Sequence, residues 1–299
     1  MTGATRIGQI KIAVMTVPLL LVLLYPLQKR IAIRTNFLEN ETGDTLFATG
    51  PMLKKLSLGY DSLLADIYWT RVVQYYGARL GHAGANFDQL APLLNVTTTL
   101  DPHLLIAYRF GGTFLAEGQP IGAGRPDLGA DLVKRGIAAN PDEWQLYSDL
   151  GTIYYWHTKN YQAAAQAFWQ GGDIAGAPPW MKPFAAHIAQ EGMSRDTSRF
   201  MWSQVYKEAT DERIRRNAMN HLKELQTEAD LEALTQIAAA YKKQFGHFPA
   251  SGADVLAAGM ARAIPKDPAG YAYRMSSNGT PSVDPASPIA ALLKELAQQ

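Results

Sequence analysis

The residue types that most often carry acid–base, metal or nucleophilic chemistry are sparse in this chain of 299 residues. It contains no cysteine, which excludes disulfide bonds, thiolate nucleophiles and cysteine-ligated zinc or iron–sulfur centres. We predict no catalytic site, no metal and no cofactor, and we expect the histidines to lie at the surface or in turns. None of the six belongs to an HExxH-type pair of ligands: His82, His103, His157, His187, His221 and His247.

One carboxylate is the best candidate for a hydrolytic alternative. Glu117 stands near the end of an expected helix, and an enzyme of this kind would need such a carboxylate in a cleft, with a raised pKa. Glutamate is common at helix ends, and no nucleophile–base pair accompanies this one. We therefore expect no enzyme. The alternative is an envelope protein that binds or hydrolyses glycan or lipid on an α-superhelix.

An apolar run near the N-terminus predicts a membrane anchor. Residues 12–27 carry no charge, and lysines that can reach the interface flank the run at positions 11 and 29. The run is short for a perpendicular span of about 20 residues. It lacks the small-x-small site of a cleaved signal peptide, which is one alternative; a buried soluble helix is the other. The residues expected in the anchor are Ile12, Val17, Leu20, Leu24 and the interfacial aromatic Tyr25.

Basic residues on both sides of this run leave its orientation finely balanced. We place the N-terminus inside, because a short anchor with a basic start usually behaves as an uncleaved export signal. This predicts a single-pass protein of the inner (cytoplasmic) membrane with its body in the periplasm. A net charge of +1 gives no field that would attract nucleic acid, so the expected partners are the membrane and other protein subunits.

Prolines mark a repeat in the body of the chain. Pro102, Pro141 and Pro179 are spaced by 39 and 38 residues, and each separates two expected helices. With one pair of helices upstream and one downstream, the pattern predicts about five helical hairpins. Their helices are 60–81 with 86–100, 102–118 with 126–140, 141–158 with 160–174, 178–192 with 195–209, and 211–226 with 228–246.

The third hairpin resembles the tetratricopeptide repeat. Small residues in that family let two antiparallel helices approach closely, and large side chains fill the gaps between hairpins. The resemblance implies an all-α, right-handed α-solenoid that binds proteins through its concave surface. The units here are longer than the family's usual 34 residues, with one extra residue in the turn 157–159. The matching positions are Tyr147, Leu150, Gly151, Tyr154, Tyr161, Ala164, Phe168 and Gly171.

The segment 60–77 has more aromatic side chains than one core face needs. An apolar set suffices for that face: Leu63, Leu64, Ile67, Val72 and Val73. The further aromatic side chains are of the type that fills a partner groove, or they pack against neighbouring parts of the chain. These candidates for a partner contact are Tyr68, Trp69, Tyr75 and Tyr76.

After residue 245 the helical rhythm ends, and two short strands are expected at 271–275 and 280–283. The order GHFP, IPKDPAGYAYRM and NG resembles the closing segment of type II secretion pseudopilins. The apolar run lacks the pilin processing motif, so the resemblance covers the tail alone. Aspartates of this region hold calcium in pseudopilins; here they are too widely spread for a good site, and we expect them to cap turns: Asp254, Asp267 and Asp284.

The segments predicted from the sequence are an anchor (1–34), a linker (35–58), a repeat domain (59–245) and a tail with a short hairpin and a terminal helix (246–299). Solenoids offer extended binding surfaces and no prearranged chemistry. We therefore interpret the chain as a membrane-anchored scaffold for protein–protein interaction. The combination of anchor, repeat and tail favours an accessory subunit of a bacterial envelope assembly, such as a pilus, secretion or transporter complex.

Overall fold

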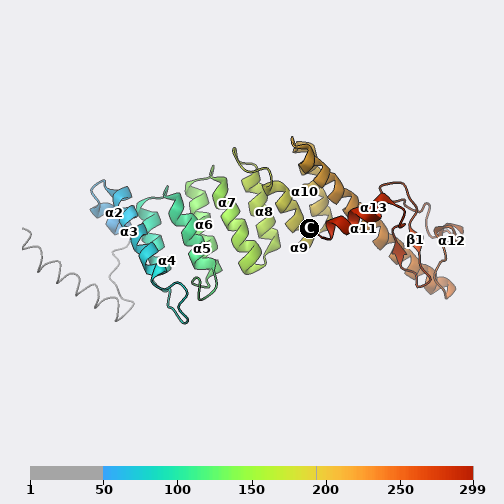
Figure 1. Cartoon of the computed structure of the whole chain (residues 1–299), viewed down its shortest axis with the longest axis horizontal. Helices are drawn as coiled ribbons and strands as arrows, with labels where there is room; N and C mark the ends of the chain where they lie inside the picture. Colours follow the sequence, from blue (N-terminus) through green and yellow to red (C-terminus); the bar gives the residue numbers. More distant parts are fainter. Residues whose placement is uncertain (1–49, 193, 299) are drawn as a thin grey trace, which may run out of the picture.

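A computed structural model describes residues 50–192 and 194–298. The expected anchor, with its residues Ile12 to Tyr25, and the linker up to residue 49 lie outside the described residues. In the part that is described, no helix is both long enough and apolar enough to cross a membrane. The prediction of a mainly helical chain is confirmed, since helices follow one another along this part and only two short strands interrupt them (Figure 1).

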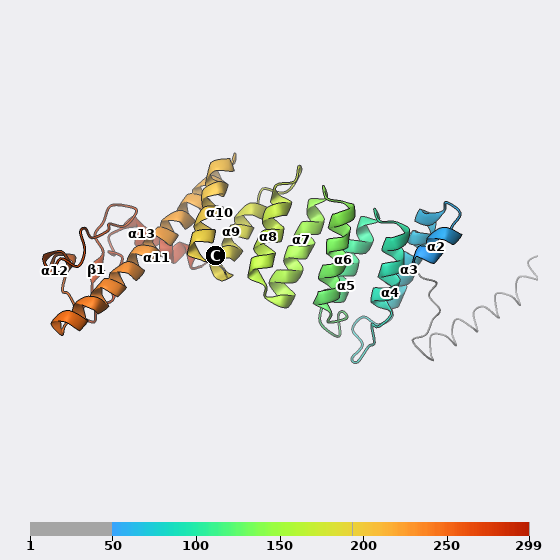
Figure 2. The same cartoon turned by 180° about the vertical axis from the view of Figure 1, so that it is seen from behind.

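The helices stand side by side in an elongated row (Figures 1 and 2). A short helix, α2 (Gly50–Leu56), opens the described part of this row, and all of it lies within the segment 35–58 that was expected as a linker. Successive helices then pack as hairpins. They are α3 (Asp61–Gly77) with α4 (Leu90–Leu100), α5 (Leu105–Ala116) with α6 (Pro126–Ala139), α7 (Trp144–Thr152) with α8 (Tyr161–Gly172), and α9 (Met181–Gly192) with α10 (Arg195–Glu208).

The last expected hairpin is instead one helix. α11 (Glu212–Phe245) runs unbroken for 34 residues, so the prediction of separate helices at 211–226 and 228–246 is wrong. No glycine or proline interrupts this stretch, and Thr227, at the expected break, is buried and donates its hydroxyl to the Lys223 carbonyl at 2.8 Å. The helix ends where Gly246 adopts a left-handed conformation with φ of 80°.

Two clusters of buried side chains form the core along the row. The first lies between α3 and α8, and the second lies between α8 and α11. Helix α8 contributes to both, because Ala167 packs into the first cluster while Ala164 and Phe168 pack into the second. The apolar contacts therefore continue from hairpin to hairpin, as in a helical repeat.

Glycines allow the closest approaches between helices. A Cβ atom at Gly151 would lie 2.6 Å from the Phe168 ring, and one at Gly171 would lie 2.6 Å from the Met181 side chain and 2.7 Å from Tyr147 Cβ. Both glycines are among the matched repeat positions. In the same hairpin, Leu150 is buried, 8% exposed.

The matched tyrosines lie at the borders between neighbouring helices. Tyr147 donates its hydroxyl to the Pro141 carbonyl at 3.1 Å. Tyr154 is half-buried against the first core cluster. Tyr161 lies close to Gly192 at the end of α9, and a Cβ atom added to that glycine would lie 2.4 Å from the Cβ atom of Tyr161. Tyr161 thus joins the hairpin α7–α8 to α9.

The extra residue of this hairpin is absorbed at the end of its first helix. Residues Ile153–Thr158 form a π-helical segment, η1, that continues α7. A π turn contains more residues than an α turn, so it accommodates an insertion without breaking the helix. Lys159 then closes η1 in a left-handed conformation, and Trp156 is left 61% exposed.

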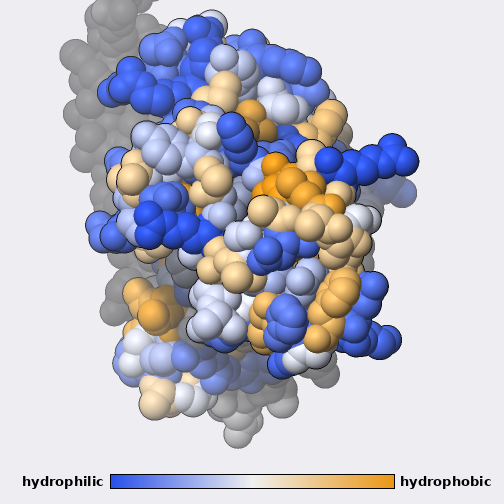
Figure 3. Space-filling view, turned by 90° about the vertical axis from the view of Figure 1, so that its right-hand side faces the viewer, coloured by the Kyte–Doolittle hydropathy of each residue, from blue (hydrophilic) through white to orange (hydrophobic). Residues whose placement is uncertain are grey.

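The C-terminal tail packs on α11. It contains α12 (Gly252–Ala257), the antiparallel strands β1 (Arg274–Met275) and β2 (Pro281–Ser282), and α13 (Pro288–Leu296). Both β2 and α13 contact α11, and the Tyr273 hydroxyl donates to Asp230 on that helix at 2.9 Å. Seen from this end, hydrophobic side chains form small groups interrupted by hydrophilic ones (Figure 3).

The tail aspartates are engaged in turns. Asp254 accepts two backbone N–H groups at the start of α12, and Asp267 accepts those of Ala269 and Tyr271 at 3.0 and 2.8 Å. Asp284 accepts the Ala286 N–H and pairs with a neighbouring arginine. No group of three or more metal-ligating side chains occurs within residues 50–192 and 194–298.

Candidate interaction surface

A hollow of about 300 Å³ lies between α5 and α7, the first helices of two neighbouring hairpins. We call it the α5–α7 groove. Its walls combine apolar side chains with an arginine, a glutamate and a glutamine. The residues that line it are Leu105, Ile106, Arg109, Phe110, Glu143, Gln145 and Leu146.

The apolar wall comes from one face of α5. Ile106 and Phe110, four residues apart, share that face and are 42% and 51% exposed. Phe110 lies against Phe114, with ring centroids 6.2 Å apart, and Phe114 stacks on Tyr76 at 3.7 Å. The exposed ring of Phe110 is thus supported from behind by packed aromatic side chains.

Arg109, the lining arginine of α5, forms an ion pair with α7. Arg109 Nε lies 2.7 Å from Asp149 Oδ2. Burial raises the pKa of Asp149, and the hydrogen bond and charge of Arg109 oppose that rise. Among the described residues only Nε of this arginine is hydrogen-bonded, so its two terminal nitrogens are left to donate to a ligand.

Gln145 supplies an acceptor that has no partner. Its Oε1 is buried and is the one buried side-chain nitrogen or oxygen atom without a hydrogen bond in the described part of the chain. A buried acceptor left unpaired costs about 1–3 kcal/mol. A ligand in the groove relieves this cost if the Gln145 amide turns so that its oxygen meets an N–H donor.

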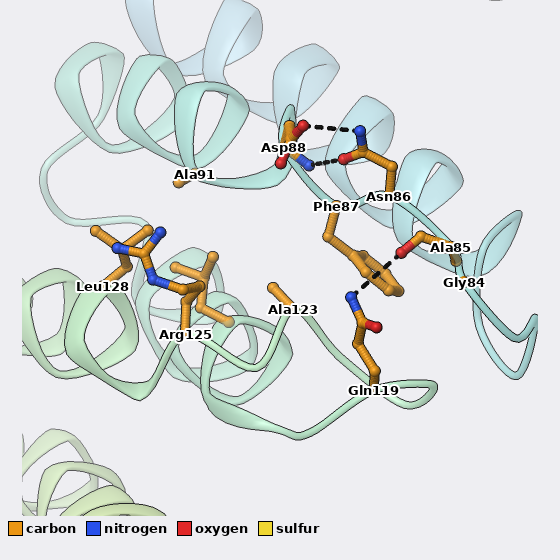
Figure 4. Close-up of a pocket in the computed structure, with 11 residues that line it drawn as sticks. Gly84, Ala85, Asn86, Phe87, Asp88, Ala91, Gln119, Ala123, Arg125 and Leu128 are labelled. Atoms are coloured by element: carbon orange, nitrogen blue, oxygen red, sulfur yellow. Dashed lines mark hydrogen bonds between the residues drawn. The ribbon is translucent and has the colours of Figure 1, made fainter.

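A second hollow, of about 320 Å³, lies between the loops that join α3 to α4 and α5 to α6 (Figure 4). Its polar groups are already paired within the chain. Asn86 donates to Asp88 at 2.7 Å, Gln119 reaches the Ala85 carbonyl at 3.5 Å, and Arg125 forms a bidentate pair with a neighbouring aspartate. The α5–α7 groove is therefore the better candidate for binding.

The four aromatic residues considered for a partner contact make contacts within the chain. Tyr68 is 9% exposed, and Trp69 and Tyr76 both stack on Phe114. The hydroxyl of Tyr76 donates to a carbonyl in the loop after α5, and that of Tyr75 donates to the Asn86 carbonyl at 2.9 Å. These rings join α3 to the next hairpin and to the loops beside it.

The prediction of which residues form the core face of α3 is wrong in part. Val72 is buried and Leu64 is half-buried, but Leu63, Ile67 and Val73 are 59%, 45% and 43% exposed. The aromatic side chains take the inward positions instead, because they can reach across to the next hairpin. This reversal leaves aliphatic side chains on the outer face of α3.

His221 corrects the expectation that the histidines lie at the surface or in turns. It is 7% exposed and stacks on Trp202 with centroids 4.2 Å apart. Its Nδ1 lies 3.0 Å from Glu224 Oε2, which also accepts a hydrogen bond from Gln190 at 2.8 Å. Burial alone would raise the pKa of Glu224, but these hydrogen bonds outweigh it and hold that pKa below its ordinary value.

Glu117, the carboxylate of the hydrolytic alternative, follows the last residue of α5. Its Oε1 lies 3.9 Å from His157 Nε2, and its side chain is 38% exposed. The charge of Glu117 contributes to the raised pKa of Tyr76, after burial as the larger cause. The pair lies outside the lining of both hollows described above.

Comparison of the sequence with models of known protein families and with curated proteins found no match. The assignment of a candidate site therefore rests on the groove itself. Sequence reasoning missed its residues, although one feature pointed to them. Residues 104–116 include a single charged side chain, Arg109, and a helix apolar on so much of its surface must expose some of it.

Proposed function

We propose that this chain is a membrane-anchored helical-repeat scaffold that binds another protein through the α5–α7 groove. The observation that carries the proposal is the unpaired Oε1 of Gln145 beside two exposed apolar side chains, Ile106 and Phe110. An extended segment of a partner protein offers both backbone N–H groups and apolar side chains. The free nitrogens of Arg109 complete the set by donating to a carbonyl or carboxylate of that segment.

The wider context of the proposal comes from the sequence. The resemblance to tetratricopeptide repeats supports a right-handed solenoid whose first helices present a binding surface. The apolar run 12–27 supports an anchor in the inner membrane with the body outside. The tail, similar to the closing segment of pseudopilins, supports an accessory role in an envelope assembly such as a pilus, secretion or transporter complex.

The proposal is tested by photo-crosslinking in native membranes. A benzophenone side chain replaces Phe110 in the full chain, and a control places it at Gln166, an exposed residue of α8 outside the groove. We expect one protein subunit to be captured in defined stoichiometry from position 110 and not from position 166. Equal capture at both positions, or none at either, refutes the groove as the binding site.

Matched truncations then measure what the groove contributes. Phe110→Ala and Phe200→Ala remove rings that are 51% and 58% exposed, so neither change should unfold the protein. Truncation of a side chain at the centre of a protein–protein interface costs about 2 kcal/mol of binding free energy, or about thirtyfold in affinity. We expect that loss for Phe110→Ala with the captured subunit, and none for Phe200→Ala on α10.

A further inference from the structure

The outer face of α2 and α3 carries an unusual number of exposed apolar side chains. End repeats of solenoids normally present a polar outer face to water. Here six large apolar residues are 45–86% exposed within sixteen positions. We call them the N-terminal apolar patch: Met52, Leu56, Leu58, Tyr60, Leu63 and Ile67.

The most exposed member of the patch stands on a strained turn. Leu58 lies in the turn between α2 and α3 and has a φ of 52°. This is the left-handed region, which most residues other than glycine and asparagine avoid. Leu58 is also 86% exposed, so packing does not compensate for this conformation. Asparagine would serve a simple turn better than leucine, and the strain therefore points to a use for the leucine side chain itself.

Basic side chains are interspersed with the patch. Lys54 and Lys55 on α2 and Arg71 on α3 are exposed and form no ion pair within the described residues. Asp66 is the exposed carboxylate on the same stretch of α3. Apolar residues combined with unpaired cations are typical of segments that lie on anionic lipid headgroups.

The helix α2, which carries part of the patch, packs on α4. Gly50, the first residue of α2, is buried against α4, where a Cβ atom would lie 2.6 Å from Thr99 Cβ. In the sequence, 22 residues separate this glycine from the end of the apolar run 12–27. Even fully extended, they reach roughly 75 Å, so an anchored run sets an upper limit on the distance between the patch and the bilayer.

From these observations we infer that the N-terminal apolar patch docks on an anionic lipid surface and fixes the orientation of the row relative to the membrane. This inference rests on the anchor in the proposed function. A second copy of the chain fits the patch less well, because it would oppose the lysines with lysines. The uncharged run 12–27 leaves those lysines without a counter-charge.

The test uses the absence of cysteine from the chain. Ser62→Cys places a fluorophore among the patch residues without removing any of them, and Ala253→Cys on α12 places it at the far end of the row; both positions are exposed. The full chain is reconstituted in vesicles of phosphatidylcholine, with or without phosphatidylglycerol, that carry a lipid-bound quencher. We expect quenching at position 62 in the anionic vesicles and little at position 253.

Two variants in the Ser62→Cys background separate the contribution of the lysine charges to docking from that of the Leu58 side chain. Each lysine near an anionic surface is worth about fivefold, or about 1 kcal/mol, so Lys54→Gln with Lys55→Gln should lower the ratio of docked to undocked protein about thirtyfold. Leu58→Asn should also reduce quenching. Because asparagine tolerates a left-handed φ better than leucine, the same variant should unfold at equal or higher denaturant concentration, which excludes misfolding as the cause.

Flotation of the vesicles distinguishes failure of the membrane anchor from failure of the docking of the patch. Protein that floats with the vesicles but is not quenched at position 62 overturns the docking and leaves the anchor standing. A label that is shielded but cross-links to a second chain identifies self-association and also overturns the docking. Protein that does not float refutes the anchor and the docking together.

Discussion

Two glycines set the distance between α5 and α6, and replacing one of them tests how the row is packed. A Cβ atom at Gly129 would lie 2.6 Å from the carbonyl oxygen of Gly112, closer than real Cβ contacts come. The neighbouring group is backbone and cannot rotate away. Gly112 itself faces Val133, which is fully buried, so the two helices can relieve the clash only by separating.

The expected change in the free energy of unfolding for Gly129→Ala follows from two opposing effects. Overpacking a core costs about 1–3 kcal/mol, and a backbone neighbour places the cost in the upper part of that range. Alanine in a helix interior returns about 1 kcal/mol relative to glycine. We therefore expect a net loss of about 1–2 kcal/mol in the free energy of unfolding.

Denaturant unfolding followed by circular dichroism measures this loss, with Gly77→Ala as the matched control. Gly77 is the last residue of α3, and nothing lies within 4 Å of a Cβ atom built there. This control should therefore be stabilised by about 0.4–1 kcal/mol, because the unfolded chain loses freedom. If Gly129→Ala unfolds at the same denaturant concentration as Gly77→Ala, or at a higher one, the close approach of α5 and α6 does not limit packing.

Three further outcomes follow from single side chains. Gln145→Met removes the unpaired acceptor, so thermal unfolding should show equal or higher stability while the affinity for the captured subunit falls; a parallel fall in both would contradict the role proposed for Gln145. The lowered pKa of Glu224 contributes stability above the pKa of the unfolded carboxyl, and that stability is lost as the pH falls through the folded pKa. The wild type should therefore lose more stability than Glu224→Gln between pH 6 and the acid range, and parallel pH profiles would count against the pairing with His221. Asp267→Ala removes an acceptor of two backbone N–H groups and of the Ser287 hydroxyl, and should raise hydrogen exchange in the tail while α5 and α6 stay protected.

The features that the sequence predicted are those that local chemistry determines. Prolines that precede α5, α7 and α9 by two or three residues marked the hairpins, because a proline cannot continue a helix. The unbroken α11 was missed, although residues 212–245 contain neither glycine nor proline. Extending the two-helix pattern of the preceding units to this stretch predicted a break at Thr227, but no residue there favours the end of a helix.

The candidate site escaped prediction because it depends on exposure, which a single sequence specifies poorly. The alternation of apolar and polar residues on α3 does not say which aromatic ring will reach Phe114, and that contact decides which side chains turn outward. The unpaired Oε1 of Gln145 likewise arises from the arrangement of two hairpins and has no sequence pattern of its own.

The two ends of the described row differ in a way that bears on how the protein is used. At the C-terminal end, α11 extends roughly 50 Å and the tail covers part of it through Tyr273, Asp230 and the packing of α13. Burial and the nearby Asp230 carboxylate raise the pKa of Tyr273, so its hydroxyl remains a donor throughout the neutral range. At the opposite end of the described residues, α2 presents exposed apolar side chains. Exposed leucines at this end of the described row support the docking proposed for the N-terminal apolar patch, and the sequence from α2 leads back toward the apolar run 12–27.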